Sequence, residues 1–128
     1  MFSYLSHLEC PNCGDHHDAA RPAGLCGCGS PLLARYDLPR VASAVGPRGI
    51  AGRPPTLWRY HELLPVHSPE HVVSLGEGMT PLLGLPRYGA RVGVPQLLVK
   101  DEGLLPTGTF KARGAAVGVS RARELGVR

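Results

Sequence analysis

The chain has 128 residues, enough for one ordinary domain or for one small domain and part of another. Hydrophobic residues make up 43%, but with two Phe and one Trp a core must rest on Leu, Val and Ala. The net charge of +4 comes from basic residues scattered singly along the chain, which argues against nucleic-acid binding and is compatible with an anionic metabolite.

Three segments differ in composition. Residues 1–38 hold all four cysteines and end in a short apolar run that predicts a strand. Residues 39–75 form a connector rich in Pro, Gly and His, in which residues 57–64 predict two helical turns stopped by the following proline. No segment has the length of a transmembrane helix or the pattern of a signal peptide, so we expect a cytoplasmic protein without a membrane partner.

The third segment, residues 76–128, predicts a strand, a loop and a helix. Residues 96–100 are a short, mostly apolar run typical of a buried strand. After a loop, Thr109 is expected to cap a helix that runs to about Leu125, where Gly126 suits the helix end. Two glycines inside this helix cost roughly 1 kcal/mol each against alanine, which close packing of the backbone would offset. The pattern is half of a β-α-β unit, so the fold class is α/β, with a parallel sheet that needs further strands.

The four cysteines form two closely spaced pairs, Cys10 with Cys13 and Cys26 with Cys28. In the first pair, the following Gly14 accepts the left-handed backbone of a turn that aims both sulfurs at one ion. Four thiolates at two hairpin tips would make a closed structural zinc site, and so small a segment would depend on the metal for stability. Residues 1–38 are therefore predicted to be a zinc-ribbon-like segment.

Other interpretations of these cysteines remain open. They are compatible with reduced structural thiols that hold no metal, whereas disulfides are improbable in the cytosol. Redox chemistry at the first pair would need the β-α-β surroundings of a thioredoxin, which the sequence lacks. His16 and His17 could replace a cysteine ligand, but surface histidines in the intervening loop fit the pattern better.

Lys111 is the strongest candidate for chemistry, because it lies in the first turn of the predicted helix. The helix dipole disfavours a cation there by roughly a few tenths of a kcal/mol, and Arg113 adds a second positive charge nearby. The position thus favours an uncharged, nucleophilic amine that can form a Schiff base with a carbonyl. Phe110 offers a flat apolar face for an aromatic ring. Judged by spacing alone, an exposed lysine without a function fits equally well.

One segment resembles the cofactor-lysine motif of the fold type II, tryptophan-synthase-β-like pyridoxal-phosphate enzymes: Pro106-Thr107-Gly108-Thr109-Phe110-Lys111, followed by Arg113-Gly114. Three further stretches, in matching order, are similar to the threonine synthases of that family: residues 74–82, residues 57–65, and the cysteine pairs that lead to residues 36–38. Two positions depart from the pattern: Ala112 stands where many members have Asp, and Thr109 replaces the usual Ser but keeps its hydroxyl.

The resemblance implies that Lys111 holds pyridoxal 5'-phosphate and that Phe110 packs against the cofactor ring. It makes Thr107, Thr109 and Arg113 candidate neighbours of the cofactor or of a substrate phosphate. The implied reaction is the lyase step of threonine biosynthesis that converts O-phospho-L-homoserine and water to L-threonine and phosphate, with Lys111 moving protons. The small-molecule partner is then a phosphorylated amino acid.

The family's enzymes are several hundred residues long, and an oligomer is compatible with the full enzyme. Their glycine-rich phosphate loop and the partners of the cofactor ring do not lie within residues 1–128. We therefore expect residues 76–128 to be the beginning of a truncated catalytic domain, inactive by itself. Two alternatives remain: another fold type II enzyme, such as a threonine dehydratase or a cysteate synthase, and a non-catalytic zinc-ribbon binding module, which would leave the Lys111 motif unexplained.

Overall fold

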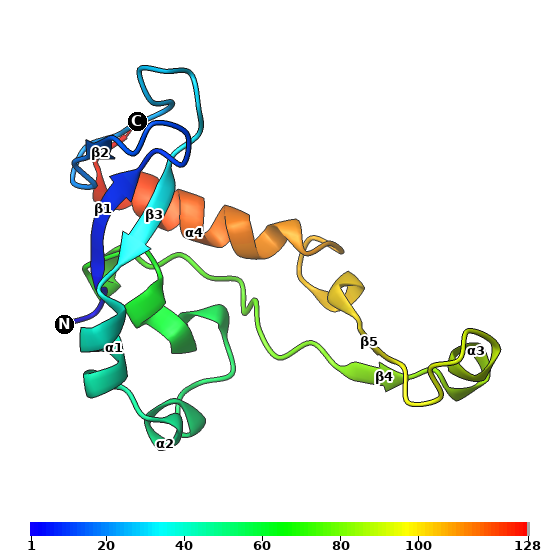
Figure 1. The fold of residues 1–128 in the computed structure, drawn as a ribbon. Coiled ribbons are helices and arrows are strands. Elements are labelled where there is room, and N and C mark those ends of the chain that lie inside the picture. Colours follow the sequence, from blue (N-terminus) through cyan, green and yellow to red (C-terminus); the bar gives the residue numbers. More distant parts are fainter. Residues whose placement is uncertain (128) are drawn as a thin grey trace.

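The computed structural model describes residues 1–127, which form an amino-terminal body and a long arm, joined by one helix and by the extended segment at residues 72–81 (Figure 1). The body begins with three short strands, β1 (Leu5–Glu9), β2 (His16–His17) and β3 (Leu33–Tyr36). They form an antiparallel sheet in the order β2-β1-β3, with β1 at the centre. β3 confirms the strand predicted at the end of the cysteine-containing segment.

The connector winds around the base of this sheet as short helical elements. These are α1 (Leu38–Ala44), α2 (Pro47–Ala51) and the 3-10 helices η1 (Leu57–Leu63) and η2 (Pro69–His71). The two helical turns predicted over residues 57–64 are present as η1, in 3-10 rather than α geometry. Tyr60 interrupts η1 with φ −106° and ψ 28°, which explains why a regular α-helix does not form.

Contacts between the η1 region and the residues just before β1 hold the connector against the sheet. The Ser3 hydroxyl donates to the Leu64 carbonyl oxygen at 2.5 Å, and the Tyr4 N–H donates to the Glu62 carbonyl oxygen at 3.0 Å. The His61 ring stacks on the Phe2 ring with 4.1 Å between ring centroids. Ser3, Glu62 and Val66 are buried, so this contact forms part of the core of the body.

Glu62 is a buried carboxylate that needs a counter-charge. Its two oxygens accept hydrogen bonds from Arg53 at 2.6 and 2.7 Å, and this pairing lowers the pKa of Glu62. Because the folded-state pKa is depressed, the pair contributes stability above the ordinary carboxyl pKa, and that contribution is lost as pH falls through the folded value.

We expect Arg53→Ala to lower the free energy of unfolding by about 3–5 kcal/mol at pH 7, because it leaves the Glu62 charge buried and unpaired. The difference from the wild type should shrink as the pH falls through the lowered pKa of Glu62, because the protonated carboxyl group no longer needs a counter-charge. Urea denaturation over a series of pH values measures the effect, and Arg87→Ala, at an exposed position of the arm, is the matched control. Equal losses in the two variants at pH 7 would contradict a structural role for the pair.

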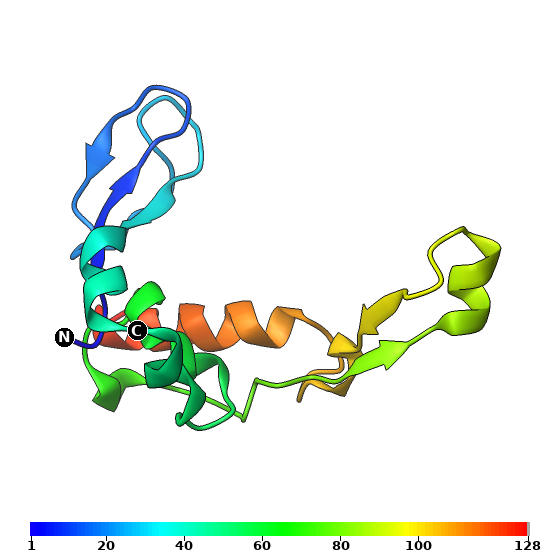
Figure 2. The ribbon, with the colours of Figure 1, turned by 60° about the horizontal axis from the view of Figure 1, so that its bottom comes forward.

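The arm contains β4 (Leu82–Gly84), α3 (Pro86–Arg91) and β5 (Leu98–Lys100). β4 and β5 pair antiparallel with each other, and Figure 2 shows them projecting away from the body. The expectation of a buried strand at residues 96–100 is wrong, because β5 is exposed along its length and neither face of its sheet is covered. β5 pairs antiparallel with β4, and this pairing does not test the parallel sheet, which was expected to need further strands.

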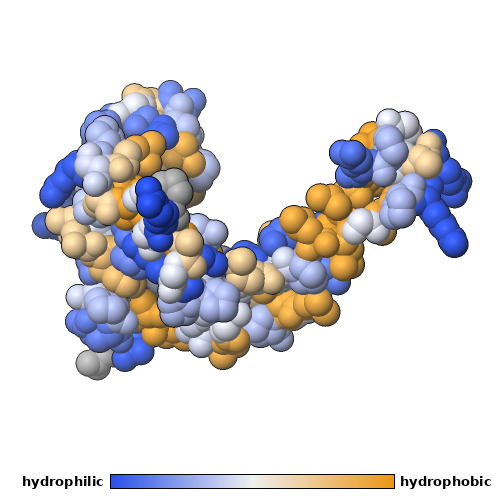
Figure 3. Space-filling view, turned by 90° about the horizontal axis from the view of Figure 1, so that it is seen from below, coloured by the Kyte–Doolittle hydropathy of each residue, from blue (hydrophilic) through white to orange (hydrophobic). Residues whose placement is uncertain are grey.

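Large apolar side chains are correspondingly exposed along the arm, as Figure 3 shows in orange. Leu82, Leu98 and Leu104 have 62%, 58% and 68% of their surface exposed. Burying such side chains stabilises a protein by about 1.5–3 kcal/mol each, so this surface is suited to be covered by further protein.

The helix that joins arm and body is α4 (Lys111–Glu124). It begins later than the sequence predicted, and its N-cap is Phe110, with no side-chain capping bond. The Thr109 hydroxyl lies instead 3.4 Å from the Thr107 hydroxyl, so the predicted cap is wrong. The predicted end is confirmed. Gly126 has φ 68°, and the N–H groups of residues 126 and 127 return to the Arg123 and Ala122 carbonyl oxygens.

The carboxyl-terminal half of α4 is fixed to the body. The Ser120 hydroxyl accepts the Val73 N–H at 2.8 Å, and the Glu124 carboxylate accepts the N–H groups of His67 and Ser68, both at 2.8 Å. Among the described residues nothing packs closely against either interior glycine of α4, so the expected compensation is not found there. In the part of the chain that the structure describes, no helix combines the length and apolar character needed to cross a membrane.

Candidate functional site

The four cysteines come together beyond the ends of β1 and β3. All four Sγ atoms lie within 4.8 Å of one another, and the Cys10–Cys28 and Cys13–Cys26 Sγ distances are both 3.5 Å. Zn–S bonds of about 2.3 Å in a tetrahedron place sulfurs about 3.8 Å apart. The cluster therefore has nearly the dimensions of a four-thiolate metal site.

Each cysteine pair is shaped by a turn that ends in a left-handed glycine. Gly14 has φ 78° and donates its N–H to the Cys10 carbonyl oxygen at 3.0 Å. Gly29 has φ 84° and makes the equivalent bond to the Cys26 carbonyl oxygen at 2.8 Å. A side chain at either glycine would strain the turn, so both pairs depend on glycine to direct their sulfurs inward.

Hydrogen bonds around the cluster favour thiolate at Cys10 and Cys28, whereas burial and neighbouring sulfurs raise the pKa of Cys13 and of Cys26. The Ser30 backbone N–H, assisted by the Asn12 amide, lowers the pKa of Cys28 to about 6. The Cys13 backbone N–H lowers the pKa of Cys10. Thiolate is the form that binds a metal ion.

His16 belongs to a different cluster from the cysteines. It lies with His7 and Glu9 on one face of the sheet, and the two imidazole rings stack with 4.2 Å between centroids. The Glu9 carboxylate accepts two N–H groups from Arg35 at 2.8 and 3.1 Å. Because the carboxylate is already paired, this group acts as a polar cross-strand cluster.

Lys111 lies at the exposed start of α4. In the described part of the chain, no hydrogen bond or ion pair involves its amine, whereas the Lys100 amine donates to the Thr80 carbonyl oxygen at 2.8 Å. Phe110 has 65% of its surface exposed beside Lys111. The Thr107 and Thr109 hydroxyls are also exposed, so four of the five predicted site residues share one open surface at the helix start. These features fit a lysine free to carry a cofactor.

Arg113, the fifth predicted site residue, forms an ion pair with Glu102 that the sequence did not predict. Its Nε and Nη2 atoms donate to the Glu102 carboxylate at 2.6 and 2.9 Å. The Thr80 hydroxyl donates to the same carboxylate, and Arg113 lowers the pKa of Glu102 to about 2. The only sequence signal for Glu102 is its place in the charged turn after the strand.

The segment before β4 is built around one buried carboxylate and one glycine. Glu77 has 2% of its surface exposed and accepts hydrogen bonds from the Ser74 hydroxyl and the Leu75 N–H. A Cβ at Gly78 would lie 1.9 Å from the Pro55 carbonyl oxygen, so no larger residue fits there without moving the backbone. The Gly-Glu-Gly sequence at 76–78 thus serves the contact between this segment and the connector.

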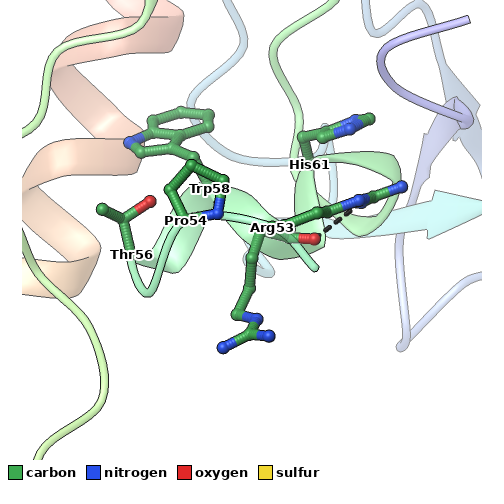
Figure 4. A pocket seen from close by; sticks show the side chains of 6 residues that line it. Arg53, Pro54, Thr56, Trp58 and His61 are labelled. Carbon is green, nitrogen blue, oxygen red and sulfur yellow. Dashed lines mark hydrogen bonds between the residues drawn. The ribbon is translucent and has the colours of Figure 1, made fainter. Parts of the chain in front are cut away.

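Two cavities lie near these elements. One of about 240 Å³, shown in Figure 4, is in the connector and is lined by Arg53, Pro54, Thr56, Trp58, Arg59 and His61. Arg53 donates to the Arg59 carbonyl oxygen across it at 2.6 Å, and both arginine guanidinium groups are bound to protein oxygens. The other, of about 120 Å³, is mostly apolar and lies along α4, with Thr107 and Ala112 in its wall. Of these two cavities, the smaller one touches the predicted cofactor surface, through Thr107.

Comparisons with known proteins agree with the motif around Lys111. The family described as pyridoxal-phosphate dependent enzyme matches residues 73–128. The chain is 42% identical over 119 residues to a threonine synthase of Methanocaldococcus jannaschii, covering 93% of this chain and 29% of that protein. It is 36% identical over 124 residues to a threonine synthase of Methanosarcina acetivorans, covering 96% of this chain and 30% of that protein.

A threonine synthase of Synechocystis is 40% identical over 93 residues, which is 68% of this chain and 23% of that protein. No solved structure matches the chain. The chain thus spans less than a third of the length of these relatives. It belongs to the fold type II pyridoxal-phosphate-dependent enzymes, as a part related to the threonine synthases.

Proposed function

We propose that the chain contributes the cofactor lysine of a threonine-synthase-like lyase that converts O-phospho-L-homoserine and water to L-threonine and phosphate. The observation that carries this proposal is Lys111 at the exposed start of α4, in a chain whose relatives are named threonine synthases. The relatives weigh against a threonine dehydratase or a cysteate synthase, which share the lysine motif.

The proposed roles follow from the residues at the helix start. Pyridoxal phosphate, when bound, supplies an electron sink for the substrate's carbon atoms. Lys111 would hold the cofactor through its amine and, once released, move protons at the substrate carbons. Phe110 would pack on the cofactor ring through its exposed face, and the Thr107 and Thr109 hydroxyls would neighbour the phosphate of the cofactor or of the substrate.

We assign residues 76–128 to the beginning of the catalytic domain, residues 1–38 to the cysteine-containing segment, and residues 39–75 to the connector between them. The uncovered apolar surface of the arm supports this assignment, since the relatives contain much more chain than residues 1–128. An oligomer of the full enzyme is compatible with it.

The cysteine cluster is proposed to hold one structural zinc ion with Cys10, Cys13, Cys26 and Cys28 as ligands. The mutual distances of the four sulfurs and the two glycine turns support this site. Four protein ligands close the coordination sphere, so the metal would stabilise the fold and take no part in the reaction. A reducing compartment such as the cytoplasm suits this proposal, because the thiols must stay reduced to bind zinc.

The rival function is a non-catalytic binding module built on the cysteine cluster. It accounts for the cysteines but assigns no role to Lys111 and its neighbours. Cofactor trapping on Lys111, described in the Discussion, discriminates between the two functions because a binding module has no need of a selectively reactive lysine.

We expect the 128-residue chain by itself to release no phosphate from O-phospho-L-homoserine. Lys111 and Phe110 are exposed, and stabilising charge in a transition state requires fixed groups in a site that excludes water. A phosphate-release assay on the purified chain measures this, with Lys111→Ala as the control. Release by the wild type that disappears in the variant would show that residues 1–128 already contain a working site.

A further inference from the structure

The charges in the first turn of α4 are unfavourable for a helix start. This turn holds two cations, Lys111 and Arg113, and neither an acidic residue nor a side-chain cap. The positive end of the helix dipole disfavours both cations, and no side chain caps the helix, although the Ala112 and Arg113 N–H groups donate to the Thr109 and Phe110 carbonyl oxygens at 3.3 and 3.2 Å. A negative charge close to this turn would therefore stabilise it.

Glu102 supplies the missing negative charge from the preceding loop. Its carboxylate lies against the Arg113 guanidinium with two N–O contacts, 2.6 and 2.9 Å long, a bidentate pairing that constrains direction as well as distance. Glu102 begins the 3-10 helix η3 (Glu102–Leu104), whose N-cap Asp101 accepts the Gly103 N–H at 3.0 Å. The carboxylate is thus presented by an ordered turn.

Thr80 connects the same carboxylate to the segment before β4. Its hydroxyl donates to Glu102, and it lies 3.4 Å from Arg113 Nη2. Thr80 has 9% of its surface exposed, and its carbonyl oxygen accepts the Lys100 amine at 2.8 Å. Arg113 also reaches the Gly78 carbonyl oxygen at 3.4 Å. One cluster therefore joins residues 78–80, the turn after β5 and the first turn of α4.

We propose that Glu102 is a positioning residue for Lys111, acting through Arg113 and oriented by Thr80. The ion pair fixes the first turn of α4, so that the lysine is presented from a rigid base. The role of Lys111 itself rests on the proposed function. The Glu102 carboxylate takes the Nε and Nη2 donors of Arg113, so we assign Arg113 to this cluster rather than to the substrate phosphate.

Hydrogen–deuterium exchange in the 128-residue chain tests the positioning directly. Glu102→Gln keeps the shape of the side chain and removes its charge, so exchange of the amides of residues 112–116 should rise about tenfold or more. Amides of residues 120–124, held by other contacts, should keep their rates. Glu70→Gln is the matched control, since Glu70 is 67% exposed and, among the described residues, its one ion pair is with His71. Unchanged exchange at 112–116 in Glu102→Gln overturns the proposal.

A milder pair of variants covers the case in which Glu102→Gln fails to fold. Thr80→Val removes the hydroxyl and leaves the ion pair, and it should raise exchange at residues 112–116 by a smaller factor. Thr80→Ser restores the hydroxyl and should exchange like the wild type. If the valine and serine variants exchange alike, Thr80 does not orient the carboxylate and this part of the cluster is wrongly assigned.

A second measurement concerns the lysine and separates this inference from the proposed function. In a longer protein that contains this chain and is incubated with pyridoxal phosphate, borohydride should trap less label on Lys111 in Glu102→Gln than in the wild type. The amount of label on Lys111 per mole of protein is the quantity compared between the two proteins. An equal amount on Lys111 in both proteins contradicts positioning, whereas an unlabelled Lys111 in the wild type contradicts the proposed function itself.

Discussion

One zinc ion per chain is expected in protein purified without chelator, and its removal should unfold the amino-terminal sheet. The sheet has two, four and five residues in its strands, too few to fold by burial of apolar surface alone. Zinc bound by four thiolates contributes on the order of 10 kcal/mol to the folding of such small units. Elemental analysis gives the stoichiometry, and far-UV circular dichroism follows the sheet.

Cys10→Ser should lower the zinc content far below one per chain, because Cys10 is a buried member of the cluster. A strong chelator should then change the wild-type spectrum and leave that of Cys10→Ser unchanged, which controls for effects of the chelator elsewhere. Clearly substoichiometric zinc in the wild type that added metal does not raise would rule out the site.

We also expect pyridoxal phosphate to be trapped selectively on Lys111. In a longer protein that contains this chain, we expect an absorbance band near the edge of the visible range that borohydride reduces. Peptide mapping should place the pyridoxyl group on Lys111 and not on Lys100, the only other lysine of the 128 residues. The physical reason is that the Lys100 amine is held by the Thr80 carbonyl oxygen, while Lys111 stands exposed at the helix start.

Lys111→Ala should abolish this label, and Lys100→Ala is the matched control that should retain it. In the 128-residue chain alone, the label should be weak and unselective, because the contacts to the cofactor phosphate and ring are expected outside it. A label on Lys100, or one shared equally by both lysines in the longer protein, would show that Lys111 is wrongly assigned.

The ends of local elements were predicted with uneven success for a simple reason. Gly126 ends α4 as expected because a left-handed backbone is a property of the glycine itself. Thr109 does not cap the helix, since its hydroxyl lies near Thr107 instead. A capping bond depends on where the preceding loop turns, and residue type alone does not reveal that. The sequence predicted the strand β5 of the arm, but it did not predict that this strand is exposed or that it pairs antiparallel with β4.

The sequence by itself determined the chemical inventory of the chain. The spacing of the cysteines and their glycines, and the motif around Lys111, indicate their chemistry through neighbours a few residues apart. Only the tertiary structure revealed the Arg53–Glu62 pair, the contact of Gly78 with Pro55, and the Glu102–Thr80–Arg113 cluster. These contacts join residues that are 9 to 33 positions apart in the chain. The identity of a charged or small residue does not indicate which distant residue it will contact after folding.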